Sequence, residues 1–299
     1  MESRVVIPTF GCHNLLEKTL KSISKCKLPS SYEETVVIEN GSRTGSDELV
    51  SALPARLNAR YMHRERSGKS YALNEALDTI PEGLVVFFDD DVEVHPEALN
   101  AYVTAAREYG PGHFFGGSVR VDREHSFPEG LTSLFPASTK GYNASDRIGQ
   151  ERMVFLGFNW AAYTEDLKRV RGFNPLLGPG SPTGTSVGDE SDLQQRMIKE
   201  GVEPIAVPQA VVRHHVPEEH TRFRWLLKRK CHVGVFLGIK RGADKRLLSF
   251  ALEIVISIVK CFFKLLSYGR VGKYSFLCNL AKNLGKMKGY LDIKRNFSR

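Results

Sequence analysis

Through the first 110 residues, short apolar runs alternate with segments whose apolar residues recur every three or four positions. The runs predict strands at 4–10, 34–42, 59–64 and 84–91, and the periodic segments predict helices at 15–25, 47–53, 70–80 and 96–109. Strands and helices alternating at this spacing are typical of βαβ units. We therefore expect an α/β fold with a Rossmann-like, mostly parallel central sheet flanked by helices. Ligands bind such sheets at the carboxyl ends of the strands.

The second half has a different pattern. Gly and Pro clusters at 127–136 and 173–188 predict long irregular loops, which in compact domains often bind ligands or act as lids. From Leu247 to Leu266, polar residues recur at steps of three or four and nearly everything between them is apolar. This predicts a helix with a broad apolar face, which suits an interfacial helix better than a spanning one because charges interrupt it. Packing on the domain or on a second subunit is the alternative.

Charge divides the chain unevenly. Between Arg222 and Arg299 there are 19 Lys and Arg against 3 acidic residues, which leaves the first 221 residues near −8. We expect one large domain at 1–234 and a basic, helical C-terminal extension at 235–299. Basic residues around an apolar helix favour an anionic membrane surface. They do not favour nucleic acid, which has no need of the interleaved apolar residues.

Composition excludes several other classes. A hydrophobic content of 41% is enough for a large core, so a disordered chain is excluded. The five cysteines are scattered without a C-x-x-C pair, which argues against a structural zinc site and a disulfide framework. The chain opens on a strand-like run and not on the charged and apolar regions of a signal peptide, so we expect a cytoplasmic protein. With its basic tail, we expect it to be peripheral on the inner face of the plasma membrane.

Three consecutive aspartates follow the apolar run "VVFF" at 85–88. Side chains alternate along a strand, so Asp89 and Asp91 are expected on one face. Two carboxylates there can hold Mg²⁺ or Mn²⁺ whose other ligands are diphosphate oxygens, and the cation would relieve their repulsion. A solvated acidic turn capping the next helix is the alternative.

Three further motifs contain charged or polar residues suited to binding or catalysis. The "RSGKS" segment fails as a Walker motif because His63 stands where glycine is needed, yet Arg66, Lys69 and a helix start still suit an anion. Asp189, Glu190 and Asp192 open a predicted helix, where they either stabilise its dipole or supply a general base. His214 or His215 either completes a metal site or is structural.

Seven blocks, in this order, resemble the family 2 glycosyltransferases, which have the GT-A fold and use nucleotide-diphosphate sugars. They are "VVIPTFGCHNLLEKTLKSI", "VVIENGSRTGS", "SGKSYALNEAL", "VVFFDDDVEVHPEAL", "FLGFNWAAYTEDLKRVRGFNPLLG", "GDESDLQQRM" and "VVRHHVP". The resemblance covers about residues 5–234, which implies that the domain at 1–234 is a GT-A catalytic domain and leaves the basic extension outside it.

The resemblance implies roles for particular residues. Those implied for donor binding are Pro8, Thr9, Phe10, Glu39, Asn40, Lys69, Asn74, Asp89 and Asp90. Those implied for the Mn²⁺ or Mg²⁺ site are Asp91, His214 and Asp89, of which Asp89 could instead hold the ribose. The sugar and acceptor side is implied for Asn159, Trp160 and Asp192. Glu190 occupies the position of the catalytic base, and because the usual Glu-Asp order is reversed here, Asp189 is its rival.

The function implied is metal-dependent, inverting sugar transfer from a nucleotide-diphosphate donor to a hydroxyl of a glycan or a lipid-linked acceptor, in cell-surface polysaccharide synthesis. Two alternatives remain open from the residues alone. A nucleotidyltransferase would also need acidic metal ligands and a basic phosphate loop. A non-catalytic subunit that binds sugar nucleotides would tolerate the exchange of Asp and Glu at 189 and 190.

Overall fold

The computed structural model describes the chain except residues 12, 149–152, 245–246, 268 and 297–299. The strands are β1 (Ser3–Thr9), β2 (Tyr32–Asn40), β3 (Ala59–Arg64), β4 (Leu84–Phe88), β5 (Val92–Val94), β6 (His113–Arg123), β7 (Asn159–Tyr163) and β8 (Glu203–Val216). The α-helices are α1 (His13–Ile23), α2 (Ser46–Ser51), α3 (Lys69–Thr79), α4 (Ala98–Tyr109), α5 (Ala137–Lys140), α6 (Thr164–Arg169), α7 (Asp189–Lys199), α8 (Phe223–Asp244), α9 (Leu247–Ser267) and α10 (Gly269–Asn296). Short 3₁₀ turns lie at η1 (Ala55–Leu57), η2 (Thr132–Leu134), η3 (Ala144–Arg147) and η4 (Glu218–Thr221).

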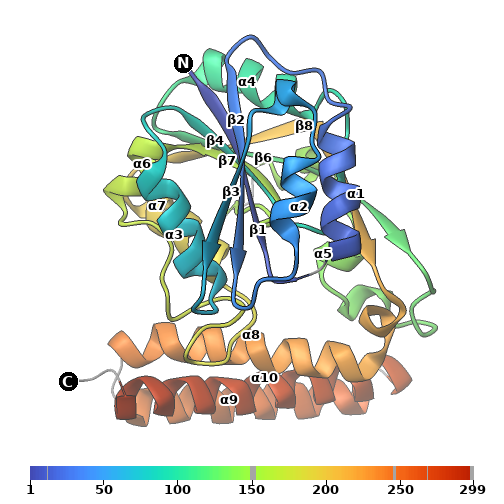
Figure 1. Cartoon of the computed structure of the whole chain (residues 1–299). Coiled ribbons are helices and arrows are strands. Elements are labelled where there is room, and N and C mark those ends of the chain that lie inside the picture. Colours follow the sequence, from blue (N-terminus) through green and yellow to red (C-terminus); the bar gives the residue numbers. More distant parts are fainter. Residues whose placement is uncertain (12, 149–152, 245–246, 268, 297–299) are drawn as a thin grey trace. The chain divides into compact units, whose positions relative to one another are not determined.

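The strands form one sheet in the order β3-β2-β1-β4-β7-β6-β8-β5 (Figure 1). β3, β2, β1 and β4 are parallel, which confirms the predicted βαβ half. β7 enters antiparallel beside β4, and β5 pairs antiparallel with the end of β8. The parallel strands therefore bring their carboxyl ends to one edge, and β7 borders that group.

Helices cover both faces of the sheet. The side chains of a strand point alternately into the two hydrophobic cores that lie between the sheet and these helices. Val5 and Ile7 of β1 pack with residues of α1 and α4 on one face. Val6 packs with residues of α3 and α7 on the other. Continuous apolar runs such as "VVFF" are what a strand buried on both faces requires.

The chain divides into two compact units. Unit 1 comprises residues 1–122, 140–175 and 189–215, and it holds most of the sheet. Unit 2 comprises residues 123–139, 176–188 and 216–299. The predicted boundary after residue 234 lies inside helix α8, and both Gly- and Pro-rich loops contribute to unit 2.

Within unit 2, glycines let α8 and α10 pack closely. A Cβ atom on Gly234 would lie 2.0 Å from the carbonyl oxygen of Lys282, and one on Gly285 would lie 2.0 Å from that of Cys231. Gly238 and Gly289 are equally crowded by backbone atoms of the facing helix. A stripe of small residues on each helix is the known means of bringing two helix backbones together.

Residues 176–188 of unit 2 are held against α8. Nδ1 of His232 accepts a hydrogen bond from the amide of Ser186 at 3.2 Å, and Phe236 packs so closely on Gly188 that no Cβ fits there. Leu177 joins Val235, Phe236 and Ile239 in a small core. The segment lacks regular secondary structure but is well anchored.

Candidate active site

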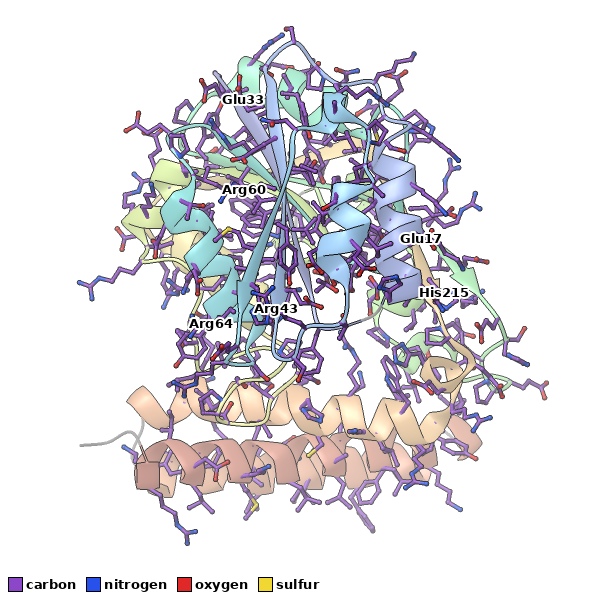
Figure 2. All side chains as sticks on the ribbon, viewed as in Figure 1. Glu17, Glu33, Arg43, Arg60, Arg64 and His215 are labelled. Carbon is purple, nitrogen blue, oxygen red and sulfur yellow. The ribbon has the colours of Figure 1, made fainter. Side chains whose placement is uncertain are left out.

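The site lies at the carboxyl edge of the parallel strands in unit 1. Asn40, the last residue of β2, donates from Nδ2 to the carbonyl oxygen of Thr9 at 2.7 Å and accepts from the amide of Gly68 at 3.0 Å. It thus joins the ends of β1 and β2 to the start of α3. Arg64, at the end of β3, and Arg43, in the loop after β2, mark the same edge in Figure 2, and Glu33 marks the opposite one.

The three aspartates do not extend β4, which ends at Phe88. They occupy the turn before β5, so the expected alternation of Asp89 and Asp91 along a strand is wrong. Each carboxylate has a different partner: Lys69 for Asp89, Thr9 for Asp90 at 2.5 Å, and His214 for Asp91. In a strand Asp89 and Asp91 would share one face, whereas in this turn the three carboxylates reach three different partners.

Lys69 is the central cation. Its Nζ lies 2.7 Å from Oδ1 of Asp89 and 2.7 Å from Oε1 of Glu190, residues that are far apart in the sequence. Burial alone would lower the pKa of Lys69, but the carboxylates of Asp89 and Glu190 raise it well above its usual value. The ammonium is therefore charged, and it unites the aspartate turn with the start of α7.

Asp189 and Glu190 differ in ionisation. Burial and the neighbouring charge of Glu190 raise the pKa of Asp189 well above its usual value. Burial also opposes ionisation of Glu190, but Lys69 and a hydrogen bond from Asp189 hold the pKa of Glu190 below its usual range. Of the two carboxyl groups, Glu190 is thus the more readily ionised and Asp189 the one that more readily keeps its proton.

Gly157 provides the space for this carboxylate. A Cβ atom at position 157 would lie 2.0 Å from Cδ of Glu190, so any larger side chain would displace the carboxyl group. Gly157 belongs to the turn before β7, and the sequence-based prediction assigned it no such role.

Asp91 and His214 form the part of the site best suited to a metal ion. Nε2 of His214 lies 3.2 Å from Oδ2 of Asp91, and the imidazole stacks on Phe158 with ring centroids 4.5 Å apart. Oδ1 of Asp91 is buried and has no hydrogen-bond partner among the described residues. The hydrogen bond and the charge interaction with His214 outweigh burial and lower the pKa of Asp91. Within the described part of the chain, no three His, Cys, Asp or Glu side chains form a complete metal cage.

Other predicted donor residues serve the fold as well. Glu39 is fully buried and accepts hydrogen bonds from Thr44, Ser46 and Tyr61, so both its oxygens are engaged. Asn74 makes paired hydrogen bonds with the backbone of Phe173, at 2.8 and 2.9 Å.

Pro8 is buried in β1, whereas Phe10 just beyond it is 64% exposed. A Cβ atom on Gly41 would lie 2.6 Å from the ring of Phe10, so the ring rests on the backbone of the loop after β2. Phe10 therefore offers an open aromatic face at the carboxyl edge.

The residues predicted for the acceptor side are engaged by the protein. Asn159 is fully buried, donates to the carbonyl oxygens of Ser118 and Ala210, and accepts from Tyr102. Trp160 is fully buried and stacks on Phe87 with centroids 4.7 Å apart. Asp192 forms an ion pair with Arg196 at 2.8 Å. Their positions support structural roles, and acceptor contact by any of them remains a prediction.

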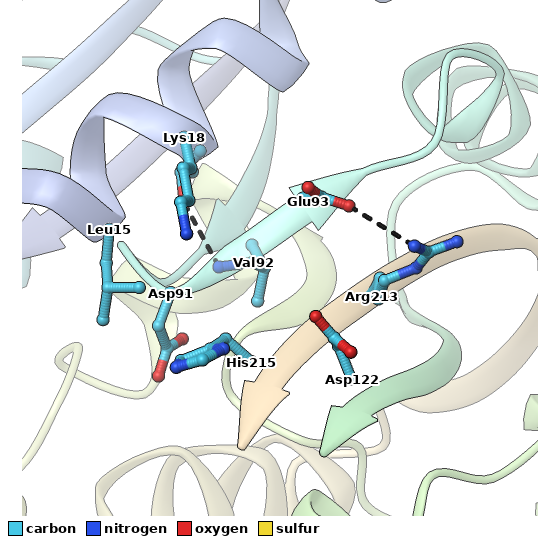
Figure 3. A pocket seen from close by; sticks show the side chains of 9 residues that line it. Leu15, Lys18, Asp91, Val92, Glu93, Asp122, Arg213 and His215 are labelled. Atoms are coloured by element: carbon cyan, nitrogen blue, oxygen red, sulfur yellow. Dashed lines mark hydrogen bonds and ion pairs between the residues drawn. The ribbon is translucent and has the colours of Figure 1, made fainter. Parts of the chain in front are cut away.

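A small pocket of about 40 Å³ opens beside Asp91 (Figure 3). It is lined by residues of α1, β5, β6 and β8, including Lys18, Asp122 and His215. Ligand pockets usually measure roughly 300 to 1,000 Å³, so this one is too small for a sugar nucleotide. A larger groove of about 560 Å³, between α4 and β8, contains none of the predicted site residues.

Structures of known proteins identify the fold. The chain superposes with a TM-score of 0.63 and 20% identity on the mannosyltransferase PcManGT from Pyrobaculum calidifontis, solved with GDP-Man and Mn²⁺, over 97% of this chain and 87% of that one. This likeness confirms the expected GT-A type of α/β fold.

Sequence comparison then identifies the family. The model described as glycosyl transferase family 2 matches residues 4–170, and the chain belongs to that family. It is 26% identical over 232 residues to the succinoglycan biosynthesis protein ExoM of Rhizobium meliloti, covering 73% of this chain and 69% of ExoM. It is also 26% identical over 176 residues to the GalNAc(5)-diNAcBac-PP-undecaprenol beta-1,3-glucosyltransferase of Campylobacter jejuni, covering 57% of this chain and 54% of that enzyme.

The protein is therefore a glycosyl transfer enzyme with relatives in polysaccharide and glycan biosynthesis. Neither the nucleotidyltransferase nor the non-catalytic subunit is supported by these comparisons.

Proposed function

We propose that the protein transfers a sugar from a nucleoside diphosphate to a hydroxyl group of a glycan or lipid-linked acceptor, with inversion at the anomeric carbon. The observation that carries this proposal is the bridge by which Lys69 joins Asp89 to Glu190. The ammonium group of Lys69 thus joins the turn proposed to bind the donor, through Asp89, to the carboxylate of Glu190. Inverting transfer requires both: a held diphosphate and a base beside the acceptor.

Lys69 is proposed to bind the diphosphate. An ammonium group has three N–H donors, and Asp89 and Glu190 take two of them. The third is available to a phosphate oxygen at the start of α3, where the helix dipole also favours an anion. The exposed ring of Phe10 is proposed to contact the nucleoside.

Asp91 and His214, with Asp89 beside them, are the residues proposed to hold Mn²⁺ or Mg²⁺. Oδ1 of Asp91, buried and without a hydrogen-bond partner in the part of the chain that the structure describes, fits a metal ligand. Diphosphate oxygens would be further ligands. The presence of Mn²⁺ with the related mannosyltransferase supports a divalent cation here. When bound, the cation would supply positive charge that stabilises the departing diphosphate.

Glu190 is proposed as the general base. It would accept the proton of the acceptor hydroxyl while that oxygen bonds to the anomeric carbon and the bond to the diphosphate oxygen breaks on the opposite face. The lowered pKa of Glu190 keeps it ionised at neutral pH. Asp189, with its raised pKa, would stabilise the Glu190 carboxylate by donating a hydrogen bond to it.

A lipid-linked or polysaccharide acceptor is supported by the two bacterial relatives, one of which is a succinoglycan biosynthesis protein and the other a glucosyltransferase named for an undecaprenol-linked glycan. We propose that the reaction takes place in the cytoplasm, where nucleotide sugars are made and free thiols such as Cys26 and Cys278 persist.

The test uses the purified full chain with a panel of nucleotide sugars and Mn²⁺ or Mg²⁺, monitoring donor binding, transfer and the released nucleotide. Glu190→Gln should lower kcat by about 10²- to 10⁴-fold with donor affinity retained. Glu200→Gln, the same change at an exposed position after α7, should have no effect. Unchanged turnover of Glu190→Gln would refute the assignment, and a larger loss in Asp189→Asn would make Asp189 the base.

A further inference from the structure

Exposed apolar side chains are concentrated on two helices of unit 2. Of the 13 large apolar side chains exposed in the described part of the chain, nine belong to α9 or α10. Scattered exposed apolar residues are normal, but a concentrated patch marks an interaction surface.

On α9 the exposed apolar residues share one side. Leu252, Val255, Ile256, Val259 and Phe262 are 44–60% exposed. At 3.6 residues per turn they fall within an arc of about 120°. The opposite side of α9 is the buried one, where Phe250 stacks on Tyr290 of α10 and Ser257 meets Asn283.

The exposed side of α10 carries apolar and basic residues together. Leu284, Met287 and Leu291 are 45–57% exposed. Among the described residues, five further exposed ones lie within an arc of about 120° that includes them. Apart from Gly269 at the start of the helix they are all basic: Lys273, Lys288, Lys294 and Arg295. The eight apolar residues of α9 and α10 together with these four basic residues are called the outer face below.

The outer face is not needed to hold the helices together. α10 contacts α8 through Gly285 and Gly289, and it contacts α9 through Asn283 and Tyr290, none of which belongs to the outer face. The apolar residues of the outer face are therefore available to something outside the chain.

We propose that the outer face binds an anionic lipid surface, with the apolar side chains among the lipids at the interface and the basic side chains at the headgroups. No helix of the described residues has an apolar stretch long enough to cross a bilayer. An amphipathic helix lying in the membrane plane needs only one apolar face with basic neighbours, as α9 and α10 provide. On the inner leaflet of the plasma membrane, which is anionic, this surface would make the enzyme peripheral.

Charge favours lipid over a second copy of the chain. Residues 247–296 contain nine Lys and Arg against two acidic residues. One of the two, Glu253, already lies 3.8 Å from Arg241 of α8. A symmetric dimer through the outer face would oppose lysines to lysines, whereas an anionic headgroup complements them.

The test measures co-sedimentation of the full chain with vesicles of phosphatidylcholine alone or with part of it replaced by phosphatidylglycerol. Binding should require phosphatidylglycerol and weaken as salt is added. The substitutions Val255→Asp and Val259→Asp together should lower the partition constant at least about 10-fold. Thr104→Asp with Tyr109→Asp adds the same charge to an exposed side of α4 and should change it far less.

A second set of substitutions removes basic residues and leaves the apolar side chains of the outer face unchanged. Replacing Lys273, Lys288 and Lys294 by Gln should lower binding on the order of 100-fold, at about fivefold per charge. Circular dichroism and thermal unfolding identify any variant that fails to fold. Equal binding to neutral vesicles, or vesicle binding that neither set of substitutions reduces, would overturn the proposal. So would a concentration-dependent dimer, without vesicle binding, that the two Asp substitutions dissociate.

Discussion

Gly157 and Glu190 compete for the same space: a Cβ atom on Gly157 would lie 2.0 Å from Cδ of Glu190. Gly157→Ala should therefore displace the carboxylate and lower kcat about 10-fold or more, with a smaller change in donor affinity. Its cost in stability should be about 1–3 kcal/mol, as for other overpacked sites.

Shortening the carboxyl side chain is the control for this clash. Glu190→Asp removes one methylene and so leaves room for a Cβ atom at position 157. Gly157→Ala should therefore reduce kcat much less in the Glu190→Asp variant than in the wild-type protein. If both backgrounds lose the same factor, the two residues are not coupled and the steric argument fails.

Lys69 should be essential for stability as well as for activity. Its ammonium group neutralises the partly buried carboxylates of Asp89 and Glu190. Lys69→Met leaves both uncompensated, so urea unfolding at neutral pH should show a loss of about 3–5 kcal/mol. Lys69→Arg, which keeps the charge, should lose much less. Wild-type stability of Lys69→Met would mean that the carboxylates find other partners.

Glu39 should make stability depend on pH. Burial opposes its ionisation, but hydrogen bonds from Thr44, Tyr61 and Ser46 lower its pKa. A lowered pKa in the folded state means that its contribution is present above the unfolded pKa and is lost as pH falls through the folded value. Glu39→Gln should therefore cost about 1–3 kcal/mol at pH 7 and less in acid.

The matched control is Glu33→Gln, on the same strand but exposed. It should change the free energy of unfolding by less than about 0.5 kcal/mol at any pH. A Glu39→Gln deficit that stays constant down to strong acid would contradict the role of the ionised carboxylate.

The glycine stripe of unit 2 predicts unequal effects of one substitution. In Gly285→Ala the new Cβ meets the carbonyl oxygen of Cys231 at 2.0 Å, so the helices must separate. In Gly242→Ala it meets Cγ2 of Ile293, a side chain that can rotate. Alanine gains about 1 kcal/mol of helix propensity in both. Thermal unfolding should show a net loss of about 2 kcal/mol for Gly285→Ala and little change for Gly242→Ala. Equal losses would contradict a backbone clash.

The fold was predictable because its signals are local. Each strand and helix expected in the first 110 residues is present within a few residues of its predicted ends. The error at 89–91 arose because an apolar run does not reveal where a strand stops. Pairing of β4 ends at Phe88, and Asp89, Asp90 and Asp91 each reach a different partner from the turn that follows.

The sequence indicated which residues form the candidate site, but it did not indicate which of them contact one another. The expected residues Lys69, Asp89 and Glu190 do meet, but the meeting depends on the arrangement of α3 and α7 against the sheet, which periodicity does not encode. The space beside Gly157 was invisible for the same reason. The glycines at 234, 238 and 242 did offer a sequence signal for close helix packing, in their regular spacing of four.

Because residues 176–188 are anchored on α8, a chain that ends where the family resemblance ends, at residue 234, would lose part of that anchor. A chain ending at residue 234 would keep every predicted site residue and also His232. It would lose Phe236 and Ile239, the side chains that hold Leu177 and Gly188 in place. Gly188 is joined directly to Asp189, so truncation would release the segment that leads into α7, the helix that carries Glu190. An inactive truncated protein would therefore be no evidence that catalysis needs a membrane.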